Sequence, residues 1–179
     1  MQKEKMTGRV IWITGMSGAG KTTVARCLYE RLSGAVLLDG DELRAALGAD
    51  SCSYDVEGRK KLAMSYARLA GLLAGQGLTV IVATISLFHE VHSYNRQHLP
   101  GYLEVFLDVP EAVRRSRDPK GLYAAETAGS KNPLVGGGAR AELPLSPDIR
   151  LDDSCPAEEA AALILGRLED DGACAGHVC

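Results

Sequence analysis

The sequence has few aromatic residues, no excess of positive charge and no long apolar run. Aromatic residues make up only 5% of its 179 residues, so flat stacking surfaces for several bases are scarce. Lysine and arginine together number 20 against 23 aspartates and glutamates, which argues against a protein that coats nucleic acid. No apolar run reaches the roughly 18 residues that cross a bilayer, so we expect no membrane partner.

The chain also lacks a disulfide framework. Its five cysteines are scattered and include no CxxC pair, which predicts a reduced protein of the cytoplasm. The short apolar run Val10 to Ile13 is too brief for a secretory signal. Near the end, Cys174, His177 and Cys179 supply too few ligands for a convincing zinc site, and we expect residues 171–179 to form a flexible tail.

Short β-rich runs alternate with helical stretches along the rest of the chain. This alternation predicts one α/β domain over residues 1–170, a three-layer sandwich around a mainly parallel five-stranded sheet. The run 78–85 is the richest in β-branched residues, and we expect it to be the central strand. The predicted strands cover 9–14, 35–39, 78–85, 102–107 and 149–151, and the predicted helices cover 20–33, 41–47, 56–75, 88–98, a short segment after Pro110, and 156–168.

Residues 118–147 do not fit this alternation. The segment carries four prolines and three consecutive glycines at 136–138. Such a long irregular connection inside a compact domain is typically a functional lid or a disordered loop. We therefore predict a lid over 118–147.

The strongest motif is GMSGAGKT at residues 15–22, which matches GxxxxGK[ST] between a predicted strand and a predicted helix. Glycines let backbone N–H groups surround a phosphate, and the helix N-terminus adds a positive dipole end. Lys21 can reach the β- and γ-phosphates, and the Thr22 hydroxyl can hold Mg²⁺. The motif predicts a P-loop NTPase-type fold that binds ATP and Mg²⁺ through Gly15, Ser17, Gly18, Ala19, Gly20, Lys21, Thr22 and Thr23.

GTP-switch proteins share this loop, but the sequence disfavours that class. They also need an Asn-Lys-x-Asp motif after a later strand, and the chain has none. The segment Asp55–Gly58 matches DxxG, yet it does not follow a predicted strand. We attribute that match to chance.

Two carboxylates stand at the end of the second predicted strand. Asp39 and Asp41 should lie beside the phosphate loop, because ligands of open α/β sheets bind at the carboxyl ends of the strands. One can support Mg²⁺ and the other can accept the proton of an attacking hydroxyl. We assign the metal to Asp39, with Thr22, and the base to Asp41, with the alternative that one of them only caps the next helix.

Three blocks together resemble adenylylsulfate kinases: residues 15–22, residues 38–44 with Asp39 and Asp41, and the RDPKGLY run at 117–123. Thr84-Ile-Ser86 also fits that family. The resemblance covers about residues 10–151. It implies transfer of the ATP γ-phosphoryl group to the ribose 3′-hydroxyl of adenylyl sulfate, a small nucleotide acceptor, and it implies a homodimer.

The resemblance also implies roles for further residues, each with a plain structural alternative such as surface charge or packing. The acceptor's sulfate and phosphate would be bound by arginines, whose forked guanidinium groups suit such anions. Tyr54 falls where the family stacks an aromatic on the acceptor base, and Ser86 falls beside the phosphates with a catalytic role. The residues implied for the acceptor are Arg44, Tyr54, Arg59, Ile85, Ser86, Arg96, Lys120 and Leu134, and those for a lid over ATP are Arg117 and Lys120.

The acceptor half also departs from the family pattern. Leu87 stands where the family has proline, and His89 and His92 stand where it has arginines. Neutral histidines would weaken anion binding. The lid's stacking aromatic is replaced by Leu134.

Three readings of the function therefore stay open. The first is a divergent adenylylsulfate kinase. The second is a sibling kinase for another nucleotide, because Tyr94-Asn-Arg96-x-x-Leu99 is similar to relatives that phosphorylate cytidine diphosphoramidate in capsule synthesis. The third is a non-catalytic ATP-binding module.

Overall fold

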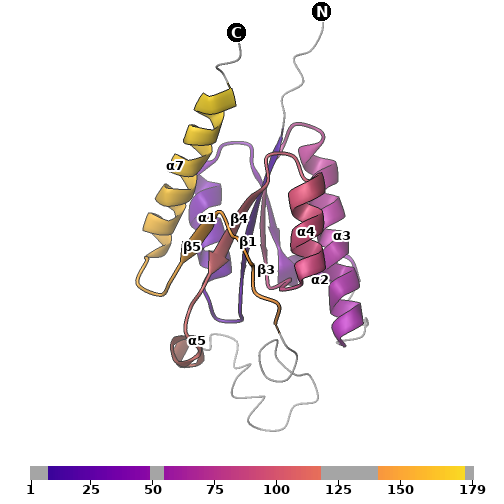
Figure 1. The fold of residues 1–179 in the computed structure, drawn as a ribbon, viewed down its shortest axis with the longest axis vertical. Helices are drawn as coiled ribbons and strands as arrows, with labels where there is room; N and C mark the ends of the chain where they lie inside the picture. Colours follow the sequence, from indigo (N-terminus) through magenta and orange to yellow (C-terminus); the bar gives the residue numbers. More distant parts are fainter. Residues whose placement is uncertain (1–7, 49–54, 118–140, 176–179) are drawn as a thin grey trace, which may run out of the picture.

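Five parallel strands form one sheet with helices on both faces (Figure 1). The structure, a computed structural model, describes residues 8–48, 55–117 and 141–175, with side chains up to residue 170. The strands are β1 (Arg9–Gly15), β2 (Val36–Asp39), β3 (Thr79–Thr84), β4 (Leu103–Leu107) and β5 (Ile149–Leu151). The helices are α1 (Lys21–Arg31), α2 (Gly40–Ala46), α3 (Val56–Ala74), α4 (His89–His98), α5 (Glu111–Arg117) and α7 (Ala157–Ala175).

The strand order is β2-β3-β1-β4-β5, which confirms the predicted α/β sandwich and corrects one detail. The strand in the middle is β1, and the β-branched strand β3 lies beside it, so the prediction that 78–85 is central was wrong. β-Branched residues are favoured wherever a strand is buried on both faces, and this property does not single out the middle of a sheet.

Alternate residues of β1 build the two halves of the core. Ile11 and Ile13 pack in a cluster with α1 and α7, whereas Val10 and Trp12 pack in a second cluster with α3 and α4. Residues Val10 to Ile13 are fully buried, as expected for a parallel strand covered on both sides. Because β1 leads directly into residues 15–22, the predicted phosphate loop leaves the sheet at its middle strand.

The predicted elements agree with the structure to within about two residues at most ends, with one clear exception. Helix α7 continues to Ala175, past its predicted end at 168, and so includes the first residues of the expected tail. None of the helices in the described part of the chain has the length and apolar character that crossing a bilayer requires.

The DxxG match has a structural explanation. Asp55 is the N-cap of α3, and its side chain accepts a hydrogen bond of 2.7 Å from the Gly58 N–H. An acceptor at this position satisfies one of the free N–H groups of the first turn. The motif is a helix cap, in agreement with our dismissal of a GTP-switch role.

Candidate active site

The predicted phosphate loop has a backbone that suits glycine. Gly18 and Gly20 have φ of +77° and +93°, which side chains with a Cβ rarely adopt. A Cβ on Gly15 would lie 2.7 Å from the Leu107 carbonyl oxygen of β4, and one on Gly18 would lie 3.0 Å from the Arg114 carbonyl oxygen of α5. The loop is therefore shaped by close backbone contacts with β4 and α5.

The side chains of the loop differ in how far they are exposed. Lys21, at the start of α1, folds back so that Nζ donates a 2.8 Å hydrogen bond to the Met16 carbonyl. Its ammonium group thus lies over the loop. Ala19 is buried in the core, Ser17 is half-buried, and Thr23 is exposed on α1.

Asp39 connects the loop to the start of α2. Its Oδ2 accepts a 2.7 Å hydrogen bond from the Thr22 hydroxyl, and its Oδ1 accepts one of 2.9 Å from the Asp41 N–H. Asp39 is therefore the N-cap of α2, so the capping alternative applies to it, and it also reaches the loop threonine. The Asp41 residue is exposed in the first turn of α2.

The oxygen atoms of Thr22 and Asp39 fit a magnesium ion. Mg²⁺ prefers oxygen ligands, keeps several waters and is bound through one or two protein groups together with substrate phosphates. A hydroxyl and a carboxylate that already touch, next to a phosphate loop, supply those groups. Among the described residues no cluster of three acidic, histidine or cysteine side chains offers a competing metal site.

The end of β3 lies against the same region. The Thr14 hydroxyl, next to Gly15, donates a 2.6 Å hydrogen bond to the Ile85 carbonyl, and the Thr84 and Ser86 hydroxyl oxygens are 2.9 Å apart. A Cβ on Gly40 would lie 3.1 Å from Thr84 Oγ1, so the start of α2 touches this strand end. The structure thus brings the loop, the two aspartates and residues 84–86 together.

Two predicted acceptor arginines are neighbours. The pKa of Arg59 is lowered, first by burial and then by the positive charge of Arg44, while Asp55 opposes the shift. The Arg59 Nε atom is buried without a hydrogen-bond partner. Guanidinium groups suit sulfate and phosphate oxygens, so Arg44 and Arg59 could bind such an anion together, which stays a prediction.

The third predicted arginine is engaged within the protein. Arg96 Nη1 donates to both carboxylate oxygens of Asp148, at 2.9 and 2.8 Å, and Nη2 lies 3.3 Å from Glu104 Oε2. These contacts hold residues 146–148 against α4. They give Arg96 a structural role that the sequence did not suggest.

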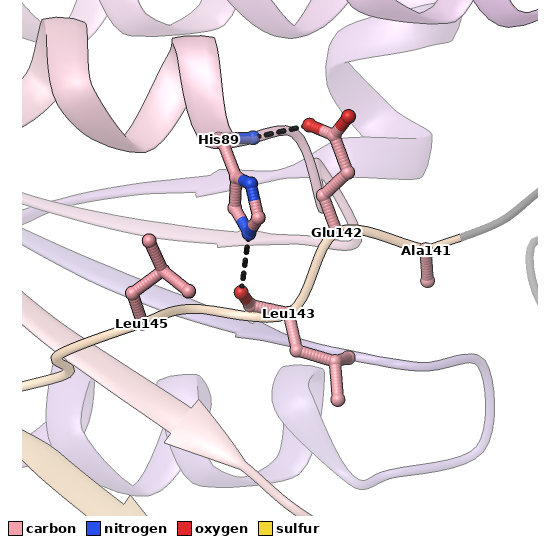
Figure 2. A pocket seen from close by; sticks show the side chains of 5 residues that line it. All are labelled: His89, Ala141, Glu142, Leu143 and Leu145. Carbon is pink, nitrogen blue, oxygen red and sulfur yellow. Dashed lines mark hydrogen bonds between the residues drawn. The ribbon is translucent and has the colours of Figure 1, made fainter.

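The two histidines that replace family arginines also contact the protein itself. His92 is buried, with Nε2 2.9 Å from the Ser86 carbonyl oxygen. His89 is exposed, with Nε2 2.9 Å from the Leu143 carbonyl oxygen (Figure 2). In both rings Nε2 is thus engaged by a backbone carbonyl of the protein itself.

A pocket of about 420 Å³ lies between the N-terminus of α4 and residues 141–145, which belong to the described part of the predicted lid. Glu142 fixes this segment, because its carboxylate accepts a 2.6 Å hydrogen bond from the His89 N–H (Figure 2). Its own N–H also donates to the Leu87 carbonyl. The pocket is lined by His89, Ala141, Glu142, Leu143 and Leu145.

The remaining predicted residues are less well placed by the structure. Arg117 is exposed at the end of α5. Tyr54, Lys120 and Leu134 lie outside the described residues. Their roles stay predictions.

Sequence reasoning missed the polar network around Glu104. This carboxylate is only 3% exposed and accepts a 3.0 Å hydrogen bond from the Tyr102 hydroxyl, while its N–H donates to Asp148. The phenol's pKa is raised, first by burial and then by the Glu104 charge, so Tyr102 stays a donor. The available signal was one acidic residue inside the apolar strand Leu103–Leu107, since buried charges are normally paired.

Comparisons with known proteins show which family the chain is similar to. The family model described as adenylylsulphate kinase matches residues 7–152. The cytidine diphosphoramidate kinase of Campylobacter jejuni is 38% identical over 165 residues, covering 89% of this chain and 95% of that protein. The adenylyl-sulfate kinase of Deinococcus deserti is 41% identical over 160 residues, covering 84% of this chain and 86% of that protein.

The fold comparison gives a similar result. A solved structure of the Mycobacterium tuberculosis APS kinase CysC in complex with AMPPNP and APS superposes with a TM-score of 0.85. It is 34% identical, and the match covers 91% of this chain and 98% of that one.

Proposed function

The chain belongs to the adenylylsulphate kinase family and is a phosphotransferase, and from this premise we propose that it transfers the γ-phosphoryl group of ATP to a ribose hydroxyl of a small nucleotide. The observation that carries the proposal is the chain of contacts from Thr22 through Asp39 to Asp41. It brings a hydroxyl and a carboxylate suited to Mg²⁺, and the backbone of Asp41, close to the predicted phosphate loop.

Phosphoryl transfer needs positioning and charge stabilisation more than covalent help from the protein. Lys21 would release Met16 and contact the β- and γ-phosphates. Mg²⁺, held by Thr22 and Asp39, would neutralise charge on the phosphate oxygens when bound. Asp41 would accept the proton of the attacking hydroxyl on a carboxylate oxygen, and Ser86 would contact the phosphates from the end of β3.

Adenylyl sulfate is the first candidate acceptor. The neighbouring guanidinium groups of Arg44 and Arg59 would bind its sulfate or phosphate oxygens. Support also comes from the family match and from the M. tuberculosis structure, which was solved with APS bound.

Cytidine diphosphoramidate is the second candidate, favoured by specific observations. The C. jejuni kinase of that name matches over 95% of its own length. In addition, His89 and His92 stand where the family has arginines, and both contact the protein itself. These replacements alter the residues expected to bind the acceptor, whereas the motif expected to bind ATP is unchanged.

A side-by-side assay tests both candidates. The purified chain is incubated with ATP and Mg²⁺ plus either adenylyl sulfate or cytidine diphosphoramidate, and ADP and the phosphorylated product are quantified by chromatography and mass spectrometry. We expect one acceptor to be consumed in step with ADP release. Nucleotide binding without ADP release with either acceptor would instead support a binding module and contradict the proposal.

The homodimer implied by the resemblance remains a prediction. Size-exclusion chromatography with light scattering would measure the mass directly, against the 19.0 kDa of a single chain. A mass near twice that value would support a dimer, and a single-chain mass would contradict it.

A further inference from the structure

The turn that follows β3 contains the one non-glycine residue with positive φ in the described parts of the chain. Ser86 has φ of +25°, a backbone conformation that is strained for a residue with a side chain. Such strain persists only where neighbouring contacts determine the backbone. The hydrogen bonds around Ser86 therefore show which residues hold its backbone in this conformation.

The turn is held from two sides. On the phosphate-loop side, Thr14 donates to the Ile85 carbonyl and Thr84 contacts the Ser86 hydroxyl. On the opposite side, the Ser86 carbonyl accepts a 3.0 Å hydrogen bond from the Phe88 N–H and lies 2.9 Å from His92 Nε2. Because a carbonyl oxygen can only accept, His92 must carry its proton on Nε2.

The other nitrogen of the His92 ring, Nδ1, faces a buried acid and makes no hydrogen bond. His92 Nδ1 lies 3.1 Å from Glu104 Oε1. Glu104 is anchored by the Tyr102 hydroxyl and by Arg96, and its N–H is bonded to Asp148. A continuous set of contacts thus runs from α4 and β4 through the imidazole to the strained turn.

We propose that His92 is a positioning residue for phosphoryl transfer, which holds the Ser86 backbone and thereby aims the Thr84–Ser86 hydroxyl pair at the phosphate site. The inference rests on the proposed function, because it assumes that Ser86 contacts the phosphates. His92 acts through Ser86 and touches no substrate. A small displacement of a group near the reacting atoms can lower a reaction rate by about a hundredfold. A shift of the Ser86 turn should therefore slow phosphoryl transfer.

Two substitutions separate positioning from simple packing. His92→Gln places an amide N–H near the position of Nε2 and can restore the bond to the Ser86 carbonyl, whereas His92→Leu keeps bulk and removes the donor. His98→Gln, an exposed histidine on the same helix, is the matched control. Steady-state kinetics are measured with ATP and the acceptor that the wild type consumes, together with the melting temperature of each variant.

We expect His92→Leu to lower kcat by roughly tenfold to a hundredfold while the KM for ATP changes by less than about twofold, because the phosphate loop is untouched. His92→Gln should recover kcat to within about threefold of the wild type, and His98→Gln should match the wild type. Normal kcat in His92→Leu, or equal losses in both His92 variants, would overturn the proposal.

The ring tautomer gives a test that needs no variant and no acceptor. In the wild-type protein with ¹⁵N-labelled histidine, NMR should show the His92 proton on Nε2. A proton on Nδ1 alone would overturn the proposal even if His92→Leu fails to fold. A wild type that phosphorylates neither acceptor, yet shows the Nε2 proton, would contradict the proposed function and leave the turn-holding contact supported.

Discussion

The hydroxyl of Thr22 and the carboxylate of Asp39 are joined by a 2.7 Å hydrogen bond across 17 residues of sequence. This contact connects the first turn of α1 to the end of β2. Both lie at the end of the sheet where its parallel strands finish.

Replacing Lys21 by alanine should lower kcat by about a hundredfold or more, because the ammonium group is expected to stabilise charge that develops on the transferred phosphoryl group. The coupled release of ADP measures the effect. Lys61→Ala, an exposed lysine on α3, is the control and should behave like the wild type. Near-normal turnover by the Lys21 variant would remove the loop from the mechanism.

Asp41→Asn should lower kcat by about a hundredfold while the Kd for an ATP analogue stays within about twofold, because only the proton acceptor is lost. Calorimetric titration gives the affinity and product formation gives the rate. If the rate is unchanged, another group accepts the proton.

Asp39→Asn should raise the Mg²⁺ concentration needed for half-maximal activity with little loss of stability. Asparagine is as good an N-cap as aspartate, so it can keep the bond from the Asp41 N–H while losing the charge that favours a cation. Asp39→Ala should lose both functions and melt at a lower temperature. Identical Mg²⁺ dependence in wild type and Asp39→Asn would argue against a metal role.

Arg59→Ala should raise the acceptor KM by roughly thirtyfold, which corresponds to about 2 kcal/mol for a hydrogen bond to a charged group. The KM for ATP should stay near its wild-type value. Arg68→Ala, an exposed arginine on α3, is the matched control. A change confined to the ATP KM would place Arg59 on the donor side.

The stability of the fold should depend on pH through His92. Burial lowers the pKa of His92 below its usual 6.5, with Glu104 opposing the shift and with Glu142 and His89 also facing the ring. The unfolded chain therefore binds this proton at higher pH than the folded chain, so the free energy of unfolding should fall as pH drops below about 6.5. Urea titrations of wild type and His92→Gln at several pH values measure this, and the wild type should lose more stability on acidification.

The sequence predicted the order of strands and helices well because the signals are local. Buried parallel strands are continuous apolar runs, and glycines and prolines mark their ends. The position of β1 in the middle of the sheet was not predicted, since strand order depends on contacts between distant segments. The phosphate loop and Asp39 were found from spacing and from the rule that ligands meet strand ends.

The roles of Arg96 and His92 could not be predicted in the same way. Arg96 is paired with Asp148, and His92 bonds to the Ser86 carbonyl and faces Glu104. These residues become neighbours only when the chain folds. A family pattern shows which residue type is usual at a position. It does not show that a replaced residue has found a new partner inside the protein.

The burial of β1 bears on how the protein responds to nucleotide. This strand is hydrogen-bonded to β3 on one side and β4 on the other, so its amide protons should exchange with deuterated solvent more slowly than those of the edge strands β2 and β5. The base of the phosphate loop is thus rigid before any ligand arrives. Protection gained on nucleotide binding should appear in α5 and the exposed start of α2, while the amides of Ile11 to Thr14 stay equally slow in both states.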